Sequence, residues 1–444
     1  MINERISKLR KMMAKRNIDA YIVPSSDPHQ SEYLADYYKT REFITGFTGS
    51  AGTAVITNKK SGLWTDGRYF IQAAKELAVG EVELYKMGVP ESISIEEFLL
   101  QEFPNRGKIA FDGNNTSVAE YENLIKKLPN FEFITDVDYV GEIWNEEGRP
   151  AKPDSKVYIF DEKYSGESTS DRIARLREMM KSRGIDYHFI GSLDDIAYLL
   201  NIRANDVQCN PVVISYLLVS ENSCNLYIDK SKLSEEVANY LKENNVSIKA
   251  YEVIARDISD IEVKKTLYLE NRKTNVAVYS SIVRGVNVVS GLNLTSIMKC
   301  HKNEVEIKNT KNAFIKDGVA LVRYLNWLET GVSTGTITEM IASEKLLEFR
   351  KQQDLFIEDS FESISAYGAN ASMPHYKPSH EHPVKVEPRG LYLIDSGGHY
   401  LDGTTDITRT VALGELKPEE IYHYTLVLKA HIALMEAKFL EGTN

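Results

Sequence analysis

The sequence has few cysteines, no long apolar run and fewer basic than acidic side chains. Its 444 residues include three cysteines, Cys209, Cys224 and Cys300, without metal-type spacing. We therefore expect no disulfide framework and a reducing, cytoplasmic compartment. No stretch is apolar enough for a secretion signal or a membrane-spanning helix. The net charge of −11 disfavours nucleic acid and anionic membranes as partners, because phosphate binding needs clustered Lys and Arg.

The glycine-rich segment 46–52 lacks the features of a nucleotide-binding loop. It has neither the Lys-Ser/Thr pair of a P-loop nor the glycine spacing of a dinucleotide fingerprint. We interpret these glycines as tight turns. The length of the chain predicts about three domains.

An internal repeat indicates two similar domains in tandem. Residues 5–25 align without a gap on residues 172–192, with ten identities in 21 positions. In each copy, apolar residues at helical spacing precede a short apolar strand. The copies continue with helix-like segments around Tyr33 and Tyr198. Two strands then follow in each copy, at 53–56 and 62–65 in the first and at 216–219 and 225–228 in the second.

Composition suggests where the domains begin and end. A polar stretch rich in Pro, Gly and Ser is typical of a linker, and a long amphipathic helix begins near residue 304. The predicted division is a first domain over 1–145, a linker over 146–170, a second domain over 171–303 and a third over 304–444.

The third region reads as helices followed by a sheet. Four apolar residues of the long helix share one face: Phe314, Leu321, Leu325 and Leu328. Gly331 is placed to end this helix, and Thr336 with Glu339 forms a capping-box pattern for the next one. Strands are predicted around 363–365, 391–395 and 406–411, followed by a helix over 418–438.

Two aspartates, Asp395 and Asp406, bracket a predicted β-hairpin. If the turn centres between Tyr400 and Leu401, the aspartates are direct cross-strand neighbours, with Cβ atoms roughly 4.5–5.5 Å apart. Such carboxylates repel unless a cation lies between them. Their oxygen atoms suit Mn²⁺, Mg²⁺ or a pair of such ions. The two residues alone also fit an acidic hairpin with Asp-Gly turn chemistry.

The segment 395–410 resembles the first metal-ligand segment of the creatinase/methionine aminopeptidase superfamily, which has the pita-bread fold. Segments 27–33, 45–53, 64–70 and 317–325 extend the resemblance to the large cytosolic Xaa-Pro aminopeptidases of peptidase family M24. The implied fold class is α/β. Two tandem creatinase N-terminal-like domains would precede the first half of an α+β pita-bread metallopeptidase domain.

The resemblance implies a site for two divalent metal ions, with Mn²⁺ expected. The superfamily uses five protein ligands, which are two aspartates followed by a histidine and two glutamates. Asp395 and Asp406 match the aspartates, with Asp406 as the bridging ligand. The other three ligands would lie beyond residue 444. We therefore interpret the chain as C-terminally truncated and expect it to be inactive as given.

The resemblance also assigns roles to His375 and Arg68. Taken alone, His375 is a loop histidine and Arg68 a surface arginine. In the family, the matching histidine contacts substrate near the scissile bond and stabilises developing charge. The matching arginine contributes to peptide binding, for which its planar fork of donors is suited. His399 and Asp402 match no functional position and are interpreted as turn residues.

The implied activity is the release of the N-terminal residue from peptides with proline in the second position. In the family, a metal-activated hydroxide attacks the Xaa-Pro bond, and a glutamate beyond residue 444 would act as general base. A homodimer is expected. The alternatives are a prolidase-like dipeptidase and a catalytically dead pita-bread binding module. The tandem N-terminal domains and the motif at 29–33 favour the three-domain aminopeptidase.

Overall fold

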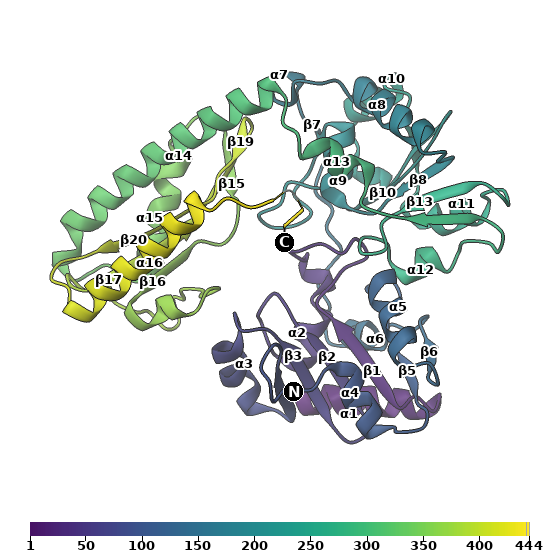
Figure 1. The fold of residues 1–444 in the computed structure, drawn as a ribbon, viewed down its shortest axis with the longest axis horizontal. Helices are drawn as coiled ribbons and strands as arrows, with labels where there is room; N and C mark the ends of the chain where they lie inside the picture. The colour runs from purple at the N-terminus through teal and green to yellow at the C-terminus, as the bar shows by residue number, and fades with distance from the viewer. Residues whose placement is uncertain (441, 444) are drawn as a thin grey trace. The chain divides into compact units, whose positions relative to one another are not determined.

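The computed structural model describes residues 1–440, 442 and 443, which divide into two compact units, 1–308 and 309–444 (Figure 1). Glu441 and Asn444, at the end of the third predicted domain, lie outside the described residues. The first unit contains two six-stranded sheets, and the second contains the acidic hairpin.

The first sheet has the strand order β4-β3-β2-β1-β5-β6. Its strands are β1 (Ala20–Pro24), β2 (Thr53–Thr57), β3 (Ser61–Thr65), β4 (Val82–Lys86), β5 (Lys108–Ala110) and β6 (Glu132–Ile134). The β1–β2 and β2–β3 pairs are antiparallel, and the others are parallel. Helices α1 (Ile2–Lys15), α2 (Thr40–Thr45), α3 (Phe70–Glu76) and α6 (Tyr139–Glu146) cover one face. Helices α4 (Ile95–Glu102) and α5 (Val118–Lys127) cover the other.

The second sheet repeats this topology in the order β12-β11-β10-β8-β13-β14. Its strands are β8 (Tyr187–Ile190), β10 (Ser215–Ser220), β11 (Cys224–Ile228), β12 (Ser247–Lys249), β13 (Thr266–Leu269) and β14 (Asn287–Ser290). Helices α8 (Thr169–Ser182), α9 (Leu193–Leu200), α10 (Glu235–Glu243) and α13 (Leu294–Lys299) cover one face. Helices α11 (Ile254–Ser259) and α12 (Val276–Tyr279) cover the other. Consecutive strand residues alternate between the two cores because side chains in a strand point to opposite faces.

The predicted repeat is confirmed by the matching positions of the two copies. Helix α1 precedes β1 at the centre of the first sheet, as α8 precedes β8 in the second. Apolar residues of both helices are buried as their spacing predicts: Ile6, Leu9, Met13, Ile173, Leu176 and Met180. The helix expected around Tyr198 is α9. No helix forms at Tyr33 itself in the described structure, where an irregular stretch is followed by a 3₁₀ helix at Asp36–Tyr38 and then by α2.

The segment predicted as a linker, 146–170, contains regular structure. Strand β7 (Tyr158–Ile159) pairs with β9 (Ile202–Arg203), and helix α7 (Glu162–Ser165) follows. The Asn303 side chain donates to the Ser165 carbonyl at 2.8 Å. This part of the segment is therefore tied to the second sheet domain.

The motif at 27–33 joins the two sheet domains. His29 is buried, and its ring nitrogens lie 2.9 Å from the Gly191 carbonyl and 2.9 Å from the Tyr251 hydroxyl. Its ring also packs against Tyr216, with centroids 4.4 Å apart. An Asp27 carboxylate oxygen accepts the His29 backbone N–H at 2.9 Å and so fixes the turn. A segment of the first domain is thus inserted into the second.

In the second unit, a helical layer packs against the sheet that carries the hairpin. The packed helices are α14 (Glu304–Gly331) and α15 (Glu339–Lys351), and α16 (Pro418–Glu436) follows the last strand. The strands are β15 (Phe356–Asp359), β16 (Ile364–Tyr367), β17 (Leu391–Ser396), β18 (Gly398–Tyr400), β19 (Gly403–Thr404) and β20 (Ile407–Ala412). Two sheets form, in the orders β16-β17-β20 and β15-β18-β19. Leu321, Leu328 and Leu346 of the helices pack against Tyr392 and Ile394 of β17.

Two details of these helices differ from the prediction. Phe314 is 41% exposed, because Ala313, Asp317 and Ala320 form the buried face at that end of α14. The N-cap of α15 is Thr338, whose hydroxyl accepts the Ile341 N–H, so the predicted capping box beginning at Thr336 is wrong. Glu339 therefore does not take part in capping α15, and its carboxylate binds other groups.

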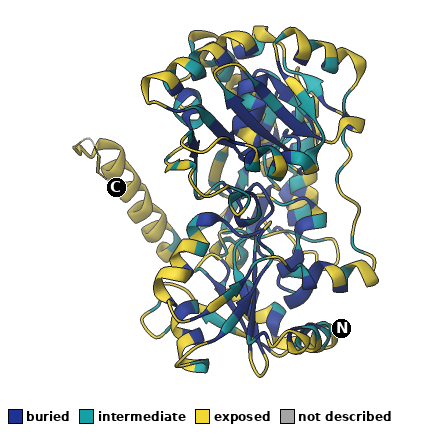
Figure 2. Ribbon diagram, turned by 90° about the vertical axis from the view of Figure 1, so that its right-hand side faces the viewer, coloured by how far each residue is buried: buried dark blue, intermediate teal, exposed yellow. Residues whose placement is uncertain are grey.

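Helix α16 has no buried residue and is exposed along its length (Figure 2). Its exposed side chains include Tyr422, Val427 and Leu434. Across the described residues, none of the helices combines the length and apolarity needed to cross a bilayer.

We predict that His188 makes the first unit sensitive to acid. His188 is completely buried, its Nδ1 lies 3.2 Å from the Tyr268 carbonyl, and its Nε2 accepts the Leu294 N–H. Burial lowers its pKa from 6.5 to about 4. The unfolded chain therefore binds more protons, and stability falls as the pH drops from about 6.5 towards about 4, by roughly 3 kcal/mol.

Urea unfolding at several pH values between 7 and 4 measures this loss in the free energy of unfolding. Hydrogen exchange of β8 and β13 over the same range shows whether it arises around His188. His188→Gln should destabilise the unit at pH 7 and flatten the pH dependence. The exposed His301→Gln is the matched control. Equal pH dependence in the two variants would contradict the prediction.

Candidate functional site

The acidic hairpin forms, with a register that differs from the predicted one. Asp395 of β17 pairs with Thr408 of β20, and Tyr400 of β18 pairs with Gly403 of β19. The turn therefore consists of Leu401 and Asp402 and centres one residue later than predicted. Asp406 is not the direct cross-strand neighbour of Asp395, so that prediction is wrong. The Thr408 hydroxyl occupies the direct position and donates to Asp395 Oδ1 at 2.7 Å.

The changed register leaves the two carboxylates on the same face. Asp406 directly precedes β20, two residues before Thr408, and residues two apart in an extended segment point to the same side. Diagonal neighbours of this kind are roughly 7–8 Å apart. Partial burial, together with the Asp395 carboxylate, raises the pKa of Asp406. The two acids are therefore close enough to interact electrostatically.

The tip of the hairpin is anchored to α14 by Asp402. Its carboxylate is buried, pairs with Lys316 Nζ at 2.6 Å and accepts from the Asn312 side chain at 2.6 Å. The interpretation of Asp402 as a simple turn residue is therefore incomplete. His399 lies in β18, with Nδ1 2.8 Å from the Thr404 hydroxyl, and so is a strand residue rather than a turn residue.

A glycine is required where β17 passes into β18. A Cβ atom on Gly397 would lie 2.0 Å from the Thr405 carbonyl oxygen and 2.2 Å from Ser360 Oγ. Backbone oxygen cannot move aside as the end of a side chain can. Any side chain at position 397 would therefore push apart the strands that carry Asp395 and Asp406.

A buried ion pair supports the strand beneath Asp395. Arg350 Nε lies 2.7 Å from Asp317 Oδ1, and neither side chain is exposed. Arg350 also donates to the hydroxyl of Ser396 at 3.0 Å, and the Tyr400 hydroxyl donates to Asp317 at 2.9 Å. The end of β17 is thereby fixed to both α14 and α15.

His375 lies in the loop between β16 and β17, as predicted, and is half-buried. Ile364, at the beginning of β16, pairs with Asp395, whereas the loop leaves the other end of the strand after Tyr367. These two ends are about 10 Å apart along the strand, since an antiparallel strand rises roughly 3.4 Å per residue. His375 thus lies in a loop that leaves the sheet of Asp395 at the end away from Asp395.

Glu339 holds this loop in place, a role that sequence reasoning missed. Its carboxylate is 1% exposed and accepts the Tyr367 N–H at 2.6 Å, the Asn370 side chain at 3.1 Å and the Tyr376 hydroxyl at 2.6 Å. Burial and the Glu339 carboxylate raise the pKa of Tyr376. Tyr376 directly follows His375, so the anchor lies one residue from the candidate catalytic side chain.

Arg68 belongs to the other unit and lies in the turn after β3. Its Nε and Nη2 donate to the two carboxylate oxygens of Asp66, each at 2.8 Å, and its side chain is 44% exposed. The hydrogen bonds to Asp66 raise the pKa of Arg68. The pair fixes the direction of the guanidinium, and Nη1 is not part of it.

The carboxylate oxygens of Asp395 and Asp406 are of the chemical type that binds hard divalent cations. Two carboxylates on one face, whose mutual repulsion a cation would relieve, match the oxygen ligands that Mn²⁺ and Mg²⁺ prefer. Within residues 1–440, 442 and 443, no group of three His, Cys, Asp or Glu side chains forms a metal-binding arrangement. Asp395 and Asp406 would thus supply part of a ligand set.

Comparison with known proteins accounts for both units. Two models of the creatinase/prolidase N-terminal domain match residues 5–141 and 148–306, and a model of metallopeptidase family M24 matches residues 308–444. Aminopeptidase P2 of Arabidopsis thaliana is 36% identical, over all of this chain and 67% of that protein. A probable Xaa-Pro aminopeptidase P of Pyricularia oryzae is 38% identical, over all of this chain and 74% of that protein.

A solved structure agrees over the same length. The X-prolyl aminopeptidase of Caenorhabditis elegans, described as a cytosolic enzyme with a di-nuclear active site, matches with a TM-score of 0.94 at 35% identity. The match covers all of this chain and 75% of that chain. The fold class predicted from the sequence, two creatinase N-terminal-like domains followed by part of an M24 pita-bread domain, is thereby confirmed.

We predict that Glu339→Gln loosens the loop 368–378 selectively. The amide retains the shape of the carboxylate but offers a single acceptor oxygen and no charge to Tyr367 N, Asn370 and Tyr376. Losing charge-assisted hydrogen bonds at a buried site costs roughly 2–3 kcal/mol. Hydrogen exchange of residues 368–378 should accelerate, while β17 and β20 stay protected.

Glu344→Gln, on the exposed part of α15, removes the same charge and serves as the control. Its carboxylate lies 2.9 Å from His380 Nε2, and His380 is outside the segment 367–376 that Glu339 contacts. Unchanged exchange in Glu339→Gln, or equal acceleration in both variants, would show that Glu339 does not anchor the loop.

Proposed function

The chain belongs to the Xaa-Pro aminopeptidase P family of M24 metallopeptidases, and we propose that it acts as a metal-dependent aminopeptidase. The proposed reaction releases the N-terminal residue from peptides with proline in the second position. The observation that carries the proposal is the hairpin with Asp395 and Asp406 on one face, in the M24 part of a chain similar throughout to aminopeptidases P.

Asp395 and Asp406 are the residues that would hold two divalent ions, Mn²⁺ by expectation. When bound, the metal pair supplies the Lewis acidity that activates water and polarises the scissile carbonyl. Because the family uses five ligands, two carboxylates do not complete the site. Residues 1–444 alone are therefore proposed to be inactive until a histidine and two glutamates join them.

His375 is proposed to donate a hydrogen bond to charge that develops at the scissile bond. Support comes from its half-buried position in a loop of the same sheet and from the Glu339 anchor beside it. Glu339 is a positioning residue in this scheme, because it acts through the loop.

Arg68 is proposed to bind the distal part of the peptide. Its pair with Asp66 keeps the guanidinium oriented, while the exposed edge of the fork suits a peptide carbonyl or carboxylate. Replacement by lysine would keep the charge and lose the planar fork.

We also propose that the protein forms a homodimer in the cytoplasm and has no nucleic-acid or membrane partner. The proposed domain limits are 1–145, 171–303 and 304–444, with a linker over 146–170. The proposed activity differs from that of a prolidase in its substrate, so Ala-Pro dipeptide and Ala-Pro-Ala tripeptide separate the two. Cleavage of the tripeptide in preference to the dipeptide supports the aminopeptidase.

We predict that Asp406→Asn abolishes dinuclear metal binding and peptide cleavage in a protein containing all five expected ligands. A neutral amide is a poor bridge between two cations, while its shape preserves the hairpin. Metal analysis and release of alanine from Ala-Pro-Ala measure the two effects. Asp354→Asn, an exposed aspartate of the same unit, is the control. Two bound ions with normal turnover in Asp406→Asn would refute the ligand assignment.

We also predict that His375→Ala lowers turnover by roughly 10²–10⁴-fold without loss of metal, the usual effect of removing one positioned catalytic group. His380→Ala, in the same loop, is the matched control and should retain normal turnover. A normally active His375→Ala enzyme would return His375 to the role of an ordinary loop residue.

A further inference from the structure

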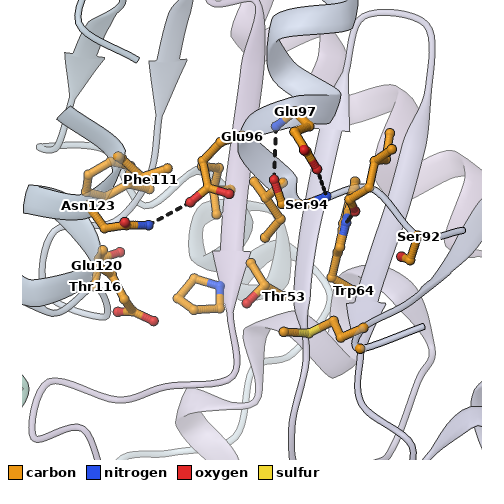
Figure 3. A pocket seen from close by; sticks show the side chains of 17 residues that line it. Thr53, Trp64, Ser92, Ser94, Glu96, Glu97, Phe111, Thr116, Glu120 and Asn123 are labelled. Atoms are coloured by element: carbon orange, nitrogen blue, oxygen red, sulfur yellow. Dashed lines mark hydrogen bonds between the residues drawn. The ribbon is translucent and has the colours of Figure 1, made fainter. Parts of the chain in front are cut away.

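A pocket of about 410 Å³ opens in the first sheet domain, away from the side chains discussed above (Figure 3). It lies between strands β1, β2 and β3 and the N-terminal ends of α4 and α5. The residues that line it do not include Arg68. Its volume falls in the range of pockets that hold small organic molecules, roughly 300–1,000 Å³.

The floor of the pocket is apolar and rigid. Ile22, Trp64, Phe111 and Leu124 line it, and all four are buried in the domain core. Trp64 is fixed because its indole N–H donates to the Ile93 carbonyl at 2.8 Å and its ring stacks on Tyr85 at 4.1 Å. An apolar ligand would therefore meet a preformed surface.

The rim of the pocket is acidic. Glu96, Glu97 and Glu120 line it, and no Lys, Arg or His does. Glu96 is already bound, because its Oε1 accepts from the Asn123 side chain at 2.6 Å and lies 3.3 Å from Nζ of Lys127, a residue outside the lining. Glu97 and Glu120 therefore set the negative charge of the rim.

Glu97 and Glu120 each use one carboxylate oxygen in the capping box of their helix, α4 and α5. Oε2 of Glu97 accepts the Ser94 N–H at 2.7 Å, and Oε2 of Glu120 accepts the Ser117 N–H at 2.9 Å (Figure 3 draws the first). The Oε1 atoms of Glu97 and Glu120 are not part of these bonds.

We propose that this pocket binds an organic amine with an aryl or branched aliphatic body. The body would displace water from the apolar floor, and the ammonium group would form a charge-assisted hydrogen bond with the acidic rim. A carboxylate on the same body would be repelled by Glu97 and Glu120. The proposal concerns binding alone and does not depend on the metal site or on peptide cleavage.

Three matched probes test the charge preference by isothermal titration calorimetry on the 444-residue protein. They are 4-phenylbutylamine, 4-phenylbutanol and 4-phenylbutanoate, which share one body and differ in charge. The amine should bind about tenfold more tightly than the alcohol, the scale of one charge-assisted hydrogen bond. The carboxylate should bind more weakly than both. Equal affinities for amine and carboxylate, or no binding of the amine at millimolar concentration, would overturn the proposal.

Variants locate the site. The double variant Glu97→Gln and Glu120→Gln keeps both helix caps, because glutamine also completes a capping box. It should lower amine affinity about tenfold and leave alcohol affinity unchanged. Glu102→Gln, on α4 but paired with Lys60 and outside the pocket, is the charge control and should bind normally. An unchanged amine affinity in the double variant would overturn the proposal.

A filling variant supplies an independent result. Thr53 lines the pocket from β2, and Thr53→Phe should occupy the space and abolish binding of the amine and the alcohol. Its folding is checked by the thermal unfolding midpoint. Retained binding in folded Thr53→Phe would place the amine elsewhere and refute the site.

Discussion

The buried ion pair between Arg350 and Asp317 is the interaction on which the second unit depends. It joins the end of α15 to the middle of α14, and Arg350 also reaches Ser396, the residue after Asp395. Removing one partner would leave a buried charge uncompensated, which typically costs about 3–5 kcal/mol. The strand that carries Asp395 is therefore held by the core as well as by the turn of its hairpin.

The hairpin shows what the sequence can and cannot predict. A continuous apolar stretch before Asp395 and β-branched residues after Asp406 predict two strands, and both form as β17 and β20. The turn is displaced by one residue because Asp402 is drawn onto α14 by Lys316 and Asn312, about ninety residues earlier in the chain. Turn chemistry is local, whereas this contact is tertiary, so the pattern around Asp402-Gly403 could not reveal the register.

The same division applies to the first unit. The repeat at 5–25 and 172–192 predicts two sheets of one topology, because local apolar spacing decides which segments become helix and strand. The insertion of His29 between Gly191 and Tyr251 could not be predicted, since its partners come from another domain. The capping role predicted for Glu339 was wrong for a related reason. The residue matched a capping pattern, yet its carboxylate binds the loop beyond β16.

Three buried carboxylates connect the helical layer to the candidate site, and they differ in what neutralises them. Asp317 and Asp402 each pair with a cation, Arg350 and Lys316. Glu339 is bound by an amide N–H, a side-chain amide and a phenol, and none of the ion pairs within the described residues includes it. The loop is held by hydrogen bonds to one carboxylate, whereas the hairpin and its strand are held by two buried ion pairs. We therefore infer that the His375 loop moves more easily than the hairpin. In the proposed aminopeptidase, Asp395 and Asp406 would stay fixed as metal ligands while the loop admits substrate and releases product.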